Sequence, residues 1–206
     1  MKTAALAALA AALWLAAPAC AAGANTGDSH SAEEGDAVVA DTARVFPSVT
    51  GRSLEGREYR LPGGFEGRAN LVLIAFRREH QALVDTWMPA AARLEASYPD
   101  FRYYELPTIG RGYSLFRSFI DGGMRAGIPD SGARARTITL YIDKTDFRAA
   151  LGLASEETVY ALVVDERGLV VHSTDGGWTA EKGEAVAHAV NGALAAGEAG
   201  GGDGGF

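Results

Sequence analysis

Glu79 and His80 are the pair of side chains in this sequence that most resembles catalytic machinery. A carboxylate that orients an imidazole can make it a general base. The pair lies where a helix is predicted to begin, and adjacent helical residues point about 100° apart, so the two side chains cannot easily pair. No serine or cysteine stands beside them, and the chain has no Gly-x-Ser-x-Gly motif. The sequence therefore predicts no catalytic residue, and we expect a protein that is not an enzyme.

The numbers and positions of the cysteines and histidines exclude further kinds of site. The only cysteine is Cys20, so residues 44–195 can form no disulfide, no thiolate metal site and no thiol nucleophile. The histidines are scattered, and no two have the i, i+4 spacing of metal ligands on one helix. We expect no metal and no cofactor. A carrier of haem or another small ligand, using His80 or His172, is a further alternative.

The strongest structural pattern is an apolar strand that runs directly into a long helix. Leu71–Phe76 is apolar throughout, and after a polar break at Arg77–Glu79 the segment His80–Ser97 carries one apolar stripe that includes Trp87. A first strand or hairpin is expected over Phe46–Phe65, with its turn at Pro62–Gly64. The remaining expected elements are the strands Phe101–Leu106, Thr137–Ile142, Val159–Val164 and Leu169–Ser173, and the helices Tyr113–Ala126 and Ala180–Ala195. A short helix through Leu151 is also expected, capped by Asp143 or Thr145 and stopped by Gly152.

This order resembles the thioredoxin-like (redoxin) superfamily: an α/β fold with a central mixed sheet flanked by helices, here with a helical insertion in the middle. In redox members the break carries Cys-x-x-Cys, and a cis-proline precedes the closing hairpin. Here the break runs from Arg77 to Gln81, and the last proline is Pro129. We therefore expect the thioredoxin-like frame without its redox chemistry.

The two ends of the chain have distinct compositions. Residues 1–19 have the pattern of a secretory signal peptide, ending in small residues before Cys20. Cys20 is therefore a candidate for lipidation, and a soluble periplasmic form is the alternative. We expect residues 20–43 to be an acidic flexible linker, 44–195 the domain, and 196–206 a disordered glycine-rich tail. Such a protein is exported to the periplasm or cell envelope, where a lipid anchor at Cys20 would be its membrane contact.

Charge is unevenly distributed along the chain. The net charge is −7, and the linker and the tail hold most of the acidic excess. The domain is nearly neutral, which argues against a nucleic-acid partner. Its densest polar stretch, Ile109–Arg148, includes Arg117, Asp121 and Arg125 at a spacing of four, which predicts a charged ladder on one helix face. This stretch is either a solvated face or a docking surface, where arginine forks recognise partner carboxylates or carbonyls.

The same helix has a predicted apolar face, formed by Leu115, Phe116, Phe119, Ile120 and Met124. By its spacing, this face would pack on the core of the domain.

Several stretches resemble the thioredoxin-like assembly factor of the mitochondrial F-type ATP synthase. The most specific are LFRSFIDGGMRAGIPD and TITLYIDKTDFRAALGL, and weaker ones are AFRREHQALVDTW and YALVVDERGLVV. The resemblance implies a cysteine-independent, chaperone-like factor that helps membrane subunits assemble. It also implies fold-defining or partner-facing roles for a set of matching residues: Arg77, Trp87, Arg117, Arg125, Asp130 and Arg136.

This chain differs from that family in carrying a bacterial-type leader instead of an arginine-rich mitochondrial presequence. We therefore expect a non-catalytic, redox-inactive, thioredoxin-like protein of the cell envelope that binds a protein partner, with membrane subunits of an ATP synthase as the candidate. The alternative is a divergent redoxin, of peroxidase or thiol–disulfide oxidoreductase type, with a degenerate active site.

Overall fold

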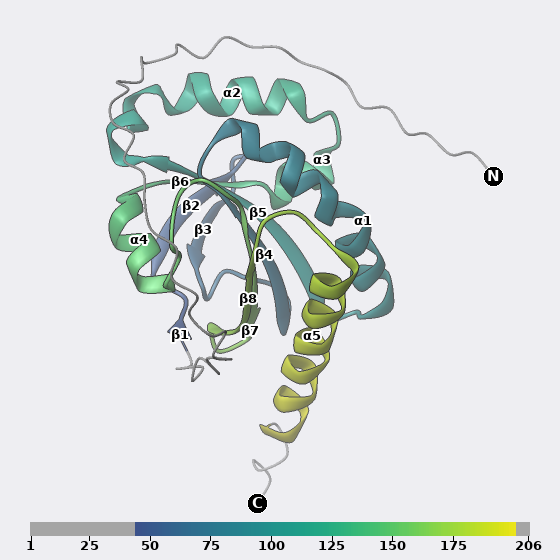
Figure 1. The fold of residues 1–206 in the computed structure, drawn as a ribbon. Helices are drawn as coiled ribbons and strands as arrows, with labels where there is room; N and C mark the ends of the chain where they lie inside the picture. The colour runs from purple at the N-terminus through teal and green to yellow at the C-terminus, as the bar shows by residue number, and fades with distance from the viewer. Residues whose placement is uncertain (1–43, 201–206) are drawn as a thin grey trace, which may run out of the picture. The chain divides into compact units, whose positions relative to one another are not determined.

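The computed structural model describes residues 44–200. They form one eight-stranded mixed sheet in the order β1-β8-β7-β4-β5-β6-β2-β3 (Figure 1). The strands are β1 (Arg44–Val45), β2 (Val49–Ser53), β3 (Glu58–Leu61), β4 (Ala69–Ala75), β5 (Phe101–Gly110), β6 (Ile138–Ile142), β7 (Tyr160–Asp165) and β8 (Leu169–Asp175). The central strands β4, β5 and β6 are parallel, and the other pairings are antiparallel.

Five α-helices and two 3-10 helices connect or flank these strands. They are η1 (Arg78–His80), α1 (Gln81–Ser97), η2 (Arg111–Phe116), α2 (Arg117–Gly127), α3 (Ser131–Arg136), α4 (Lys144–Leu151) and α5 (Ala180–Gly200). Among the described residues, no helix is long and apolar enough to cross a bilayer.

The core has two layers because β4 is apolar on both faces. Leu71 and Leu73 pack with Trp87 of α1 and with α5, whereas Val72 and Ile74 pack with Phe147 of α4. Alternate side chains of a strand point to opposite faces, so a continuous apolar run requires a cover on each side. Helices α1 and α5 accordingly lie on one face of the sheet and α4 on the other (Figure 1).

Two expected boundaries are wrong. The first hairpin turns at Leu54–Arg57, between β2 and β3, and not at Pro62–Gly64. Strand β5 does not close at Pro107 but continues to Gly110. Pro107 lies opposite Ala75, the last residue of β4, so its missing N–H falls where the neighbouring strand ends.

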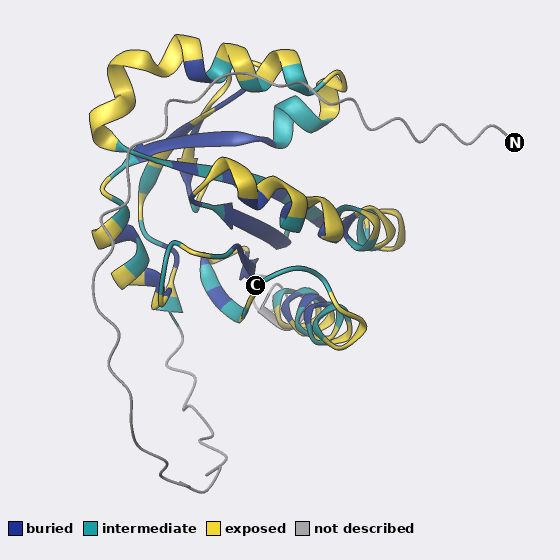
Figure 2. Ribbon diagram, turned by 45° about the horizontal axis from the view of Figure 1, so that its top comes forward, coloured by how far each residue is buried: buried dark blue, intermediate teal, exposed yellow. Residues whose placement is uncertain are grey.

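The helical insertion lies between β5 and β6, but its form differs from the expected single helix. It begins as the 3-10 helix η2, continues as α2 and adds the short helix α3. Of the expected apolar face, only Ile120 is buried, whereas Leu115, Phe116 and Phe119 are exposed. Figure 2 shows this segment at the edge of the sheet, with its outer side exposed.

Other sequence expectations agree with the structure. Asp143 caps α4 by accepting hydrogen bonds from the N–H groups of Thr145 and Asp146, and Gly152 ends that helix with a φ of 65°. The closing hairpin of β7 and β8 turns after Asp165, as expected.

Parts of both chain ends lie outside the residues that the structure describes. Helix α5 continues past Ala195 to Gly200, into the stretch expected to be a disordered tail. The expected signal peptide, the lipidation candidate Cys20, the linker up to residue 43 and the last residues, 201–206, lie outside the described residues.

Candidate functional site

The junction between β4 and α1 is the position where the thioredoxin-like frame would carry its chemistry. Strand β4 ends at Ala75, and Arg77 is extended, with φ −140° and ψ 154°. The chain then makes the single 3-10 turn η1 before α1 begins at Gln81. The side chains of Arg77, Arg78 and Glu79 are exposed here, and His80 is buried.

Glu157, in the segment just before β7, closes this junction from the opposite side. The guanidinium of Arg77 forms an ion pair with the Glu157 carboxylate. The imidazole of His80 hydrogen-bonds to the backbone of Glu157. Glu157 therefore joins the start of η1 to the segment before β7, two parts of the chain that lie far apart in the sequence.

His80 is in a poor position to act as a base. It is 4% exposed, while its neighbour Glu79 is exposed, so the two side chains point apart as expected for adjacent residues. Its Nδ1 atom has no hydrogen-bond partner. Burial, followed by the nearby charge of Arg77, lowers the pKa of His80. A neutral, enclosed imidazole with no nucleophile beside it fits a packing role better than a proton-transfer role.

The usual partner of a redox thiol is also absent from the segment before β7. Thr158 and Val159 precede the strand, where a thiol oxidoreductase would have its cis-proline. The structure does contain a cis peptide bond, which we did not expect, between Leu61 and Pro62. Pro62 contacts Gly168 in the β7–β8 turn, at the opposite end of β7.

Two of the sequence-predicted docking residues hold the insertion in place. Arg125 donates a hydrogen bond from Nε to the carbonyl oxygen of Leu54 at 2.7 Å, which fastens α2 to the β2–β3 hairpin. Asp130 accepts a hydrogen bond from the N–H of Ala133 at 2.6 Å and caps α3. Both therefore have intramolecular contacts, and the structure does not bring them together with Arg77.

A third candidate, Arg136, contacts the outer part of α1 and β5. Its Nη1 lies 3.0 Å from a carboxylate oxygen of Glu95, and its guanidinium lies 4.6 Å from the ring centroid of Tyr103. Both contacts fix α3 against its neighbours.

The expected ladder of Arg117, Asp121 and Arg125 does not form: among the described residues, no ion pair joins its members. The phenol of Tyr141 donates a hydrogen bond to Asp121 at 2.9 Å, and the Arg117 guanidinium lies 4.8 Å from the centre of the same ring. Burial, aided by the Asp121 carboxylate, raises the pKa of the Tyr141 phenol. These side chains face β6 instead of each other because the sheet offers them a closer partner.

The structure also shows polar contacts that the sequence did not indicate. Gln81, at the start of α1, donates hydrogen bonds to Asp85 at 2.9 Å and to Glu105 of β5 at 3.4 Å. Burial raises the pKa of the Glu105 carboxyl, and the hydrogen bond from Gln81 acts against that rise. No sequence motif marks this trio, because its members come from two different elements.

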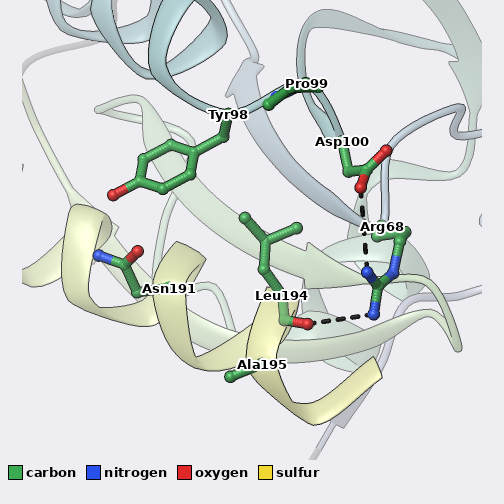
Figure 3. Close-up of a pocket in the computed structure, with 7 residues that line it drawn as sticks. All are labelled: Arg68, Tyr98, Pro99, Asp100, Asn191, Leu194 and Ala195. Carbon is green, nitrogen blue, oxygen red and sulfur yellow. Dashed lines mark hydrogen bonds and ion pairs between the residues drawn. The ribbon is translucent and has the colours of Figure 1, made fainter. Parts of the chain in front are cut away.

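A shallow depression lies between the end of α1 and the end of α5 (Figure 3). Its lining residues are Arg68, Tyr98, Pro99, Asp100, Asn191, Leu194 and Ala195. The side chain of Arg68 crosses this depression and donates a hydrogen bond to the Leu194 carbonyl at 3.1 Å. It also forms ion pairs with the carboxylates of Glu166 at 3.3 Å and Asp100 at 3.9 Å. This arrangement fastens α5 to the sheet and leaves little donor capacity for a ligand.

Comparison with known proteins bears on the fold alone. No protein-family model and no curated protein matches the chain. Among solved structures, a protein of Aquifex aeolicus VF5 described as a candidate electron transfer protein matches with a TM-score of 0.54 at 12% identity, over 73% of this chain and 97% of that one. The fold is thioredoxin-like.

Two further structures align over similar lengths but with lower TM-scores. A thiol:disulfide interchange protein from Bacteroides sp. has a TM-score of 0.49 at 18% identity, over 73% of this chain and 90% of that one. A member of the Sco family of cytochrome c oxidase assembly proteins has a TM-score of 0.49 at 11% identity, over 74% and 95%. These likenesses are too low to support an argument about activity. None of the three structures supports the narrower resemblance to the ATP synthase assembly factor.

Proposed function

We propose that this is a redox-inactive, thioredoxin-like binding protein of the cell envelope. The observation that carries the proposal is the junction of β4 and α1. There, Arg77–His80 occupy the position of a redox motif, and Arg77 and His80 are both engaged by Glu157. A site without a thiol, with an enclosed imidazole and an exposed ion pair, is suited to contact with another molecule and not to turnover. The leader-like residues 1–19 support export.

The finer proposal is that the protein is a chaperone-like assembly factor for membrane proteins. The motifs quoted above support this, and they make the membrane subunits of an ATP synthase the first candidate partner. The partner-facing residues that we propose are Arg77, Arg117, Arg125, Asp130 and Arg136. Arg77 is the best of these to test, because its side chain is 43% exposed and its ion-pair partner, Glu157, is itself 67% exposed.

The test is an affinity purification of the tagged protein from detergent-solubilised membranes of its own host, read by mass spectrometry. We compare the wild type with Arg77→Glu and with a control, Arg60→Glu, whose arginine is 88% exposed on the edge strand β3. We expect ATP synthase membrane subunits, or another envelope protein, to be enriched by the wild type and by the control, and lost with Arg77→Glu. Enrichment of no protein over an untagged sample would refute a partner-binding role, and equal enrichment by all three proteins would refute the role of Arg77.

A divergent redoxin is the second candidate, and the fold likeness to a candidate electron transfer protein favours it. Such an enzyme would have to use Cys20, the only thiol of the chain, or a chemistry without thiols. Turnover of a disulfide or peroxide substrate separates this candidate from the first.

A further inference from the structure

The insertion between β5 and β6 presents large apolar side chains to solvent. Tyr113 is 55% exposed, Leu115 91%, Phe116 61% and Phe119 79%. The only other large hydrophobic residue that is exposed among residues 44–197 is Val45, at 59%. Such a concentration within one short segment is unusual for a protein surface and marks a contact site.

This exposure is not a sign of a poorly anchored helix. The inner side of α2 is fixed by the buried Ile120, by the hydrogen bond that Tyr141 donates to Asp121 and by the one that Arg125 donates to the Leu54 carbonyl. Phe119 therefore projects from a helix that is held on its other side, whereas Tyr113, Leu115 and Phe116 belong to η2, which has no buried residue and leads directly into that helix. Figure 2 shows the outer side of this segment exposed along its length.

The charges on the same segment are positive. Between Arg111 and Ile120 there are two arginines, Arg111 and Arg117, and no acidic residue, although the chain as a whole carries −7. The nearest carboxylate in sequence, Asp121, is occupied by the phenol of Tyr141. Arg117, which is itself exposed, lies over that same ring, with its guanidinium 4.8 Å from the ring centroid. Arg125, about two helical turns after Arg117, donates its hydrogen bond to the Leu54 carbonyl.

We propose that this surface binds a lipid bilayer that contains anionic phospholipids. We call it the η2–α2 surface and define it by Arg111, Tyr113, Leu115, Phe116, Arg117 and Phe119. Leucine and phenylalanine insert below the headgroups, tyrosine lies at the interface, and arginines contact the phosphates, as in helices that lie in the membrane plane. The surface shares Arg117 with the partner-facing residues proposed above, but the inference rests on the exposed apolar side chains of the segment and not on a protein partner.

A bilayer fits this surface better than the anchor residue of a protein partner does. The most exposed side chain, Leu115, is 91% accessible, so the segment protrudes and offers no pocket for a partner's anchor residue. The positive charge complements anionic headgroups, whereas most of the acidic groups that would repel them lie elsewhere in the chain.

The experiment is co-sedimentation of the secreted chain with vesicles, carrying Cys20→Ser so that no acyl chain contributes. One vesicle preparation contains equal parts of phosphatidylglycerol and phosphatidylcholine, and the other contains phosphatidylcholine alone. We expect binding to the anionic vesicles, with weaker binding to the neutral ones and at high salt. Leu115→Asp and Phe119→Asp are expected to weaken binding by about tenfold or more, because moving a charged side chain into the apolar layer of the bilayer has a high free-energy cost.

Matched controls come from the rest of the domain. Val45→Asp changes an exposed apolar residue outside the surface, and Arg60→Glu is the counterpart of Arg117→Glu. Both controls should bind like the parent chain, while Arg117→Glu should bind more weakly. Circular dichroism checks that every variant is folded. Absence of binding to anionic vesicles, or equal binding by the Leu115 and Val45 variants, would overturn the proposal. Because no protein partner is present, neither outcome depends on the function proposed above.

Discussion

Arg77 and Glu157 form an ion pair that joins the start of η1 to the segment before β7. In the thioredoxin-like frame these two positions flank the place of the redox thiols.

We predict that this pair contributes little to stability. Its side chains are 43% and 67% exposed, and exposed pairs are typically worth about 0.2–1 kcal/mol. A double-mutant cycle of Arg77→Ala and Glu157→Ala, followed by urea unfolding, should give a coupling energy in that range. A coupling above about 2 kcal/mol would show a desolvated pair and a structural role for Arg77.

His80 should make the protein less stable in mild acid. Its folded-state pKa is lowered by burial, so it lies below the unfolded-state value of about 6.5. Between the two values the unfolded state binds more protons, so the contribution is fully present above about pH 6.5 and is lost as the pH falls towards the folded-state pKa. The free energy of unfolding of His80→Asn should depend less on pH in that window. Identical pH slopes for the variant and the wild type would contradict this account.

Trp87 should be essential to the core under α1. It is fully buried, and its Nε1 donates a hydrogen bond to the Gly176 carbonyl at 3.0 Å. Trp87→Ala should lower the free energy of unfolding by about 3–5 kcal/mol. Leu115→Ala, at a 91% exposed site, serves as the control and should change it by no more than about 0.5 kcal/mol. Comparable losses in the two variants would mean that Leu115 is packed against the domain.

Asp130 can be tested for a capping role against a docking role. As the N-cap of α3 it accepts from the Ala133 N–H, and its replacement by alanine should cost about 0.5–2 kcal/mol. Asp130→Asn keeps a capping oxygen and should retain most of the stability, as thermal unfolding will show. A partner that reads the carboxylate would bind both variants weakly. Loss of binding in the alanine variant alone would assign Asp130 to the fold.

The central strands could be predicted because a continuous run of apolar residues in the sequence indicates a strand that is buried on both faces. The apolar run Leu71–Phe76 corresponds to β4, Ala69–Ala75, which is enclosed on both faces. The cap at Asp143 and the left-handed Gly152 were also visible, since each depends on a few neighbouring residues.

The insertion could not be predicted in the same way. An apolar period indicates which side of a helix is apolar, but it does not say whether another element covers that side. No other element covers the outer side of η2 and α2 among the described residues (Figure 2). Ile120 is therefore buried in the core, while Phe116 and Phe119 are exposed to solvent. The 3-10 geometry of η2 also shifts the direction of Leu115 relative to an α-helix.

The candidate docking residues show a related limit. Arg125 looked like a surface charge, yet its partner, the Leu54 carbonyl, lies 71 positions away in the sequence. The contact of Arg136 with Tyr103 likewise crosses from α3 to β5. Contacts between distant segments depend on the topology of the fold, and the spacing of residues along the sequence does not predict that topology.

The central claim is that the domain acts by binding and not by thiol chemistry at the start of α1. The most direct test is a turnover assay of the purified protein with a protein disulfide plus a thiol reductant, and with hydrogen peroxide plus the same reductant. We predict rates no higher than those without protein, for the wild type and for Cys20→Ser alike. Multiple turnovers by the wild type would contradict the account. Their loss in Cys20→Ser would then identify the protein as a divergent redoxin that uses Cys20.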